Sequence, residues 1–217
     1  MASTVIDGVS YLLVADIGDN SRGRSYYHVH VLREPDVKNS TDSNPVLEPV
    51  ASLNVQYPDR SHDSESLATD GQSVYVLTKR DPGDGEPTGE LYKFPLTLFD
   101  ADVVAQHVGT LPERSLPMDP ITGDATTPRT IGQATALEIS PGHNTAYILD
   151  YEKVFKIQRR DNQSWDDALV TGGTFLFEHD LSQAEALTVR DDGSVWFTSE
   201  NLPTPLWALP GVGGPWL

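Results

Sequence analysis

The chain has 217 residues, and 32 acidic against 15 basic residues give it a formal net charge of −17. A surface with this charge repels phosphate backbones, which excludes nucleic acid as an expected partner. The chain has no cysteine, which excludes a disulfide scaffold and a thiolate metal site. No apolar run approaches the length of about 18 residues that a membrane-spanning helix needs, so no membrane association is expected.

The length suits one domain, and we predict a single domain over residues 1–217. With 17 glycines, 16 prolines and short runs of β-branched and aromatic residues, the composition favours strands joined by tight turns, and therefore an all-β fold. In chain order, the expected strands are 11–16, 26–32 and 50–58; 65–69, 74–79, 91–96 and 103–111; 135–140, 146–151, 154–159 and 174–181; and 185–189, 195–200 and 205–209.

These strands belong to a repeat. The segments DSESLATDGQSVYVLTK from Asp63 and QAEALTVRDDGSVWFTSE from Gln183 share one pattern, with a glutamate at the same place. Hairpin-type turns, DG at 70–71, PGHN at 141–144 and DDG at 191–193, separate the first two strands of the later units. Recurring four-stranded antiparallel units predict a β-propeller of about four blades whose first strands line a central channel. The alternative is a β-sandwich of unrelated hairpins.

Both terminal blades are expected to be incomplete. No innermost strand is identified before residues 11–16, and the last unit reaches only its third strand at 205–209. Incomplete blades have strand edges with unpaired backbone groups, and such edges recruit further strands. We therefore predict that the chain forms a homo-oligomer, most simply a dimer.

Several short motifs extend over most of the chain. They are DIGDN at 16–20 with Arg24 after it, REP at 33–35, YPDRSHDSESL at 57–67, LTK at 77–79, and QAEAL with SE at 183–187 and 199–200. Together they resemble a group of bacterial β-propeller proteins of uncharacterised function, most of which are exported or lipid-anchored. The resemblance implies an exported parent and, because that family has an earlier blade before DIGDN, an N-terminally shortened chain. The location of this chain itself is left undetermined.

The repeated glutamates, Glu65 and Glu185, fall at one position of the innermost strands, where Thr135 stands in the third unit. Because alternate side chains of a strand share a face, residues at this position converge on the channel axis. Further oxygen donors lie near the ends of the next strands: Asp16, Asn20 and Glu200. Converging oxygen donors without thiolates predict a divalent cation, calcium above all. The alternative is an ion pair between Glu65 and Lys79.

A propeller with an acid-lined channel resembles, in outline, the propeller lactonases, paraoxonases and phosphotriester-cleaving enzymes, which hold a calcium ion at the centre. The sequence matches none of their motifs, so the resemblance is one of fold and channel only. The expected function is a metal-dependent hydrolase of small activated esters, lactones or phosphotriesters. The expected metal ligands are Glu65, Glu185, Asp16, Asn20 and Glu200; the expected catalytic residues are His62, Asp63 and Lys79, with His62 or Asp63 handling water. The alternative is a non-catalytic binding module for a small ligand or a protein partner.

Overall fold

A computed structural model describes residues 1–36, 46–80, 88–112 and 131–209. They form four small sheets, one after another along the chain, in the arrangement of a four-bladed β-propeller. The predicted fold class is therefore confirmed. Each hairpin turn of the repeat contains a residue with positive φ, namely Gly71, His143 and Gly193. In the described residues, no helix is long and apolar enough to cross a lipid bilayer.

The first blade is a five-stranded sheet. Its strands, from the channel outward, are β1 (Ala2–Ile6), β2 (Val9–Asp16), β3 (Tyr27–Arg33), β4 (Ala51–Gln56) and β8 (Ala101–Val104). The expectation that this blade lacks an innermost strand is wrong, because β1 pairs with β2 along its whole length. The turn between them is Asp7-Gly8, with φ of 51° and 76°, a two-residue hairpin turn in which both positions need positive φ.

The second blade consists of β5 (Ser64–Thr69), β6 (Ser73–Thr78), β7 (Glu90–Pro95) and β9 (Gln106–Thr110). The single strand predicted at 103–111 is divided between two blades. Its first part, β8, pairs in parallel with β4 of the first blade, whereas β9 pairs with β7 of the second. The division falls at the buried Ala105, whose N–H donates to the carbonyl of Gln56 at 2.8 Å. This segment therefore links the outer edges of the first two blades.

The third and fourth blades follow the predicted order. The third blade has β10 (Ala134–Ile139), β11 (Thr145–Asp150), β12 (Lys153–Gln158) and β13 (Thr174–Glu178), with a short helix, α1 (Trp165–Leu169), between the last two. The fourth blade has β14 (Ala184–Val189), β15 (Val195–Ser199) and β16 (Leu206–Leu209). In the part of the chain that the structure describes, this last blade has three strands, as expected.

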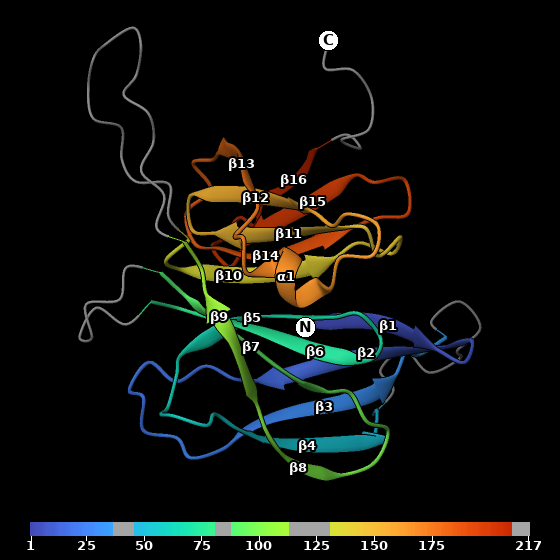
Figure 1. Ribbon diagram of the computed structural model, residues 1–217. Coiled ribbons are helices and arrows are strands. Elements are labelled where there is room, and N and C mark those ends of the chain that lie inside the picture. The colour runs from blue at the N-terminus through green and yellow to red at the C-terminus, as the bar shows by residue number, and fades with distance from the viewer. Residues whose placement is uncertain (37–45, 81–87, 113–130, 210–217) are drawn as a thin grey trace, which may run out of the picture.

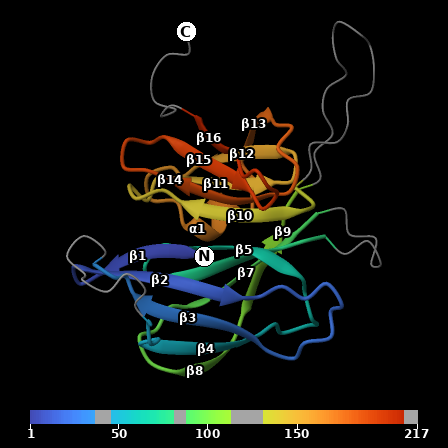
Figure 2. The same cartoon turned by 180° about the vertical axis from the view of Figure 1, so that it is seen from behind.

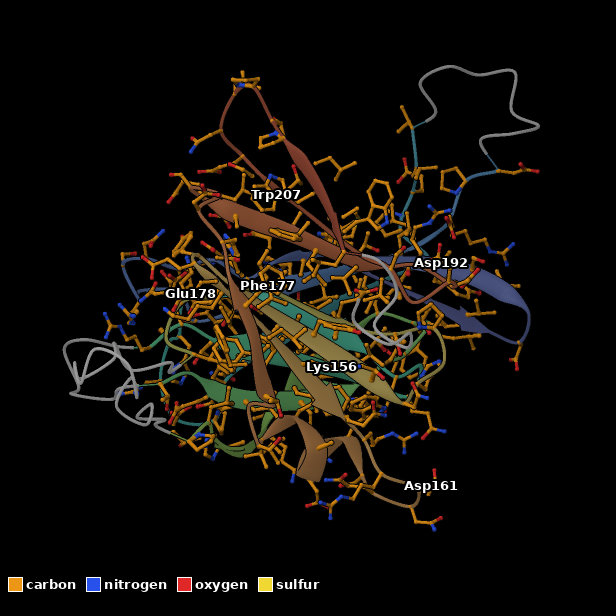
Figure 3. All side chains as sticks on the ribbon, turned by 90° about the horizontal axis from the view of Figure 1, so that it is seen from above. Lys156, Asp161, Phe177, Glu178, Asp192 and Trp207 are labelled. Carbon is orange, nitrogen blue, oxygen red and sulfur yellow. The ribbon has the colours of Figure 1, made fainter. Side chains whose placement is uncertain are left out.

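The blades pack face to face through three apolar clusters, one for each successive pair of blades. Figure 1 shows β10 facing β5 across the middle of the molecule, and Figure 2 shows β14 beside β10 from behind. Phe177 of the third blade packs against buried Phe197 of the fourth at a ring-centroid distance of 5.8 Å, and Trp207 packs on Phe197 within the fourth blade at 5.8 Å; Figure 3 labels Phe177 and Trp207. In the first blade, alternate residues of β3 and β4 are buried, as expected for strands with one face against a neighbouring blade.

Candidate functional site

The repeated position of the innermost strands lies at a β-bulge in three blades. The register between the first two strands shifts between residues 64 and 66, between 134 and 136, and between 184 and 186. The unpaired residue in each case is the one that the repeat singles out: Glu65, Thr135 or Glu185. A bulge turns the side chain of its extra residue away from the regular alternation. The three side chains therefore line the same cavity.

Two adjoining cavities share these residues. One, of about 250 Å³, is also lined by Asp16 and by Met1 at the start of the first blade. The other, of about 240 Å³, continues between the innermost strands and the last blade, with Leu67, Leu187 and Trp196 among its apolar walls. The predicted convergence of Glu65 and Glu185 is thus confirmed, and an apolar space lies directly beside them.

Lys79 forms the ion pair with Glu65 that was considered as the alternative to a cation site. Its Nζ atom lies 2.6 Å from Glu65 Oε1 and donates to the Tyr151 hydroxyl at 3.0 Å. The lysine side chain is only 7% exposed. Burial by itself lowers the pKa of this ammonium, but the hydrogen bonds to Glu65 and Tyr151 outweigh burial and raise the pKa above its usual value. The positive charge at the channel end is therefore permanent near neutral pH.

Glu185 is the titratable member of the site. Burial first, and then the charge and hydrogen bond of the neighbouring Glu65, together raise the pKa of its carboxyl to about 7, against the opposing effect of Lys79. Glu65 Oε2 is buried and has no hydrogen-bond donor among the described residues. A proton on Glu185 supplies that donor. Glu185 is therefore the carboxyl of this pair that takes up a proton as the pH falls through 7.

The other expected metal ligands have different partners. Asp16 forms a bidentate ion pair with Arg24, with N–O distances of 2.7 and 2.9 Å. Glu200 accepts a hydrogen bond from Gln183 at 3.2 Å, and Asn20 is an exposed loop residue. With Lys79 against one glutamate and Arg24 against Asp16, this donor set fits a calcium ion poorly. Calcium binding here stays a prediction, and it requires Lys79 to move away.

The two residues expected to handle water lie elsewhere. His62 is buried against the rings of Tyr57 and Tyr92, and its Nε2 atom contacts Asp59 and Glu90 rather than the channel glutamates. Although the two residues are close in sequence, His62 points toward Glu90 in the second blade, whereas the β-bulge at Glu65 turns that side chain to the channel.

Asp63 holds a loop in place. Its Oδ1 atom accepts a hydrogen bond from the backbone of Asp19 at 2.7 Å. The Asp19 carboxylate in turn accepts from the backbone of Gly23 and Arg24 and from the Tyr27 hydroxyl. The DIGDN motif therefore builds a rigid loop beside the channel.

Comparison with known proteins identifies neither a family nor a function for this chain. No protein-family model and no curated protein matches the chain. Among solved structures, it is similar to a Lactobacillus plantarum protein (8% identity, TM-score 0.40, 92% of this chain and 52% of that one). It is also similar to the computationally designed Ika8 protein (12% identity, TM-score 0.38, 91% of this chain and 54% of that one). A third similar structure is Kuenenia stuttgartiensis hydrazine synthase (10% identity, TM-score 0.37, 86% of this chain and 43% of that one). The chain spans about half the length of these structures.

Proposed function

We propose that the protein hydrolyses small, uncharged activated esters, lactones or phosphotriesters at the channel end, with Glu65 and Glu185 as a proton-sharing acid–base pair. The observation that carries this proposal is the convergence of two carboxyl groups, one with a raised pKa, on the wall of an apolar cavity of about 240 Å³. A concave apolar site with a few converging polar groups and a perturbed pKa is the usual setting of a catalytic site.

The pair supplies both proton transfers of ester hydrolysis. The ionised Glu65 accepts a proton from a water molecule as the water oxygen attacks the carbonyl carbon. The protonated Glu185 donates its proton to the carbonyl oxygen, so that a neutral tetrahedral intermediate forms. When the intermediate collapses, the carbonyl oxygen's proton returns to one carboxylate and the other carboxyl protonates the leaving alcohol. The products are an acid and an alcohol, and the pair ends with the single proton with which it began.

Lys79 and Tyr151 position this pair. The Lys79 ammonium lies 2.6 Å from Glu65 Oε1 and donates to the Tyr151 hydroxyl, so Glu65 is held from one side. The apolar walls, with Leu67, Leu187 and Trp196, favour an uncharged substrate, and the net charge of −17 discourages anionic ones. In this proposal Lys79 keeps a role at the site, whereas His62 and Asp63 have none in the chemistry.

The experiment compares hydrolysis of an aryl ester, an aryl lactone and an aryl phosphotriester by the wild type and by the Glu65→Gln and Glu185→Gln variants. Each variant should lose about 100-fold or more in kcat/KM, since each removes one proton-transfer partner. Glu152→Gln is the matched control, because that carboxylate is 72% exposed and lies outside the cavity.

Three outcomes would change the proposal. Activity that persists in both glutamine variants would overturn it. Activity that a chelator abolishes and calcium restores would instead support the cation site at Glu65 and Glu185 that the sequence predicts. Tight binding of the substrates without turnover would favour the binding module instead.

A further inference from the structure

A second cluster of ionisable side chains lies in the second blade, outside the channel. Asp59 and His62 come from the segment that leads from β4 to β5, and Glu90 is the first residue of β7. One potential ligand atom from each lies within 4.8 Å of the other two. None of these contacts involves Glu65 or Glu185, so the cluster is independent of the proposed hydrolase site.

The distances in this cluster match those around a four-coordinate metal ion. Ligands about 2.0–2.1 Å from a tetrahedral zinc ion lie roughly 3.3 Å from one another. His62 Nε2 lies 3.1 Å from Asp59 Oδ2 and 3.7 Å from Glu90 Oε2. The Tyr92 hydroxyl lies 2.9 Å from His62 Nε2 and 3.1 Å from an oxygen of each carboxylate. Five of the six distances among these four atoms therefore lie between 2.9 and 3.7 Å, and the two carboxylates lie within 4.8 Å of each other.

The histidine is fixed in place before any ligand arrives. Its side chain is 4% exposed. The ring packs against Tyr57 at a centroid distance of 4.8 Å and against Tyr92 at 5.0 Å. The His62 backbone N–H donates to the Tyr27 hydroxyl at 3.0 Å. A buried, oriented imidazole that points its Nε2 atom at two carboxylates is what a metal site requires of its first ligand.

Two side chains face both carboxylates of the cluster: the Tyr92 hydroxyl and Arg60, whose guanidinium lies 3.9 Å from Asp59 Oδ2 and from Glu90 Oε2. The single proton of the Tyr92 hydroxyl faces oxygens of both Asp59 and Glu90 as well as His62 Nε2. One proton serves only one of these acceptors at a time. A cation at the centre would satisfy all of them together.

We propose that Asp59, His62 and Glu90 bind a zinc-class divalent transition-metal ion, with the Tyr92 oxygen or a water molecule as the fourth ligand. Imidazole and carboxylate donors suit zinc and its neighbours, whereas a site with a central imidazole is poor for calcium. His107 Nε2, 3.9 Å from Glu90 Oε1, is placed to hydrogen-bond to a ligand from outside. The partial exposure of Asp59 gives the ion a route in from solvent.

The test titrates zinc into chelator-treated, untagged full-length protein by calorimetry and follows cobalt binding by its visible absorption, which is strong when the ion is tetrahedral. The wild type should bind one zinc ion per chain, and a tenfold excess of calcium should not displace it. Asp59→Asn and Glu90→Gln should each weaken binding about 100-fold or more, because each replaces a charged ligand by a neutral one.

The matched control is the double variant His28→Gln/His30→Gln. Those two histidines stack on the exposed face of the first blade, with their Nδ1 atoms bound to Asn54 and Ser52, and this variant should bind zinc like the wild type. A wild type that takes up no stoichiometric zinc overturns the proposal. So does unchanged binding by both carboxylate variants, or loss of binding in the histidine control. Thermal melts without zinc confirm that each variant is folded.

Discussion

Replacing Lys79 by methionine tests the electrostatics of the channel end. Methionine keeps most of the apolar stem but removes the charge that lies 2.6 Å from Glu65. Removing one partner of a fully buried pair costs about 3–5 kcal/mol. Because the Glu65 side chain is 30% exposed, solvent reduces this cost, and we expect a loss of about 2 kcal/mol in the free energy of unfolding at pH 8.

For a chain of this length, such a loss corresponds to a fall of about 4–8 °C in Tm. The fall should be smaller at pH 5, because Lys79 lowers the pKa of Glu185, and without the lysine the glutamate pair takes up protons more easily. The double variant Lys79→Met/Glu65→Gln should recover more than half of the loss, since no unpaired carboxylate then remains at that position.

The assay is thermal unfolding followed by circular dichroism at pH 5 and pH 8 for the wild type, both single variants and the double variant. An unchanged Tm at pH 8 would refute the reasoning. So would a fall of equal size at both pH values, because that would mean that lost packing rather than lost charge is responsible.

The remaining predictions concern pH, backbone and assembly. Because the folded-state pKa of Glu185 is raised to about 7, its contribution to stability is complete below the usual glutamate pKa and is lost as the pH rises through 7. The value of kcat/KM should also fall as the pH rises through 7. In the Glu185→Gln variant, the fall in Tm around pH 7 should disappear. Gly89→Ala should lower the free energy of unfolding, measured by denaturant titration, by about 1–3 kcal/mol, because a Cβ there would overlap the carbonyl of Thr78. Gly142→Ala, where a Cβ would make only an ordinary contact, should leave that free energy unchanged. The homo-oligomer also stays a prediction: light scattering should give about twice the 23.8 kDa of the chain, and a monomer at micromolar concentration would contradict it.

The propeller fold and most of its strands could be predicted from the sequence, because turn residues and strand alternation are local signals. Gly71 and Gly193 marked hairpins whose positive φ the structure confirms. The same signal at Asp7-Gly8 was present but overlooked, and with it the innermost strand of the first blade. The division at Ala105 was not predictable, since β8 pairs with a strand that lies far back in the chain, and no local pattern encodes that choice.

The site was predictable in part for a similar reason. Repetition placed Glu65 and Glu185 together without any knowledge of the β-bulges that aim them. The position of Lys79 at the end of the neighbouring strand was enough to suggest its ion pair. His62 was misplaced because nearness in sequence says little about direction once the chain leaves a strand. One of its two carboxylate partners, Glu90, is 28 positions away, and only the folded second blade brings the two together.

The segment that runs from β8 through Ala105 into β9 affects how the chain folds. β8 completes the sheet of the first blade, yet it follows the first three strands of the second blade in the chain. The side chains of Asp100 and Asp102 fasten this segment to Ser52 and Asn54 of β4. The first two blades therefore cannot fold one after the other like independent repeats, and they should gain and lose structure as one cooperative unit. In hydrogen-exchange experiments, the amides of β4 and β9 should open together, even though about 50 residues of chain separate them.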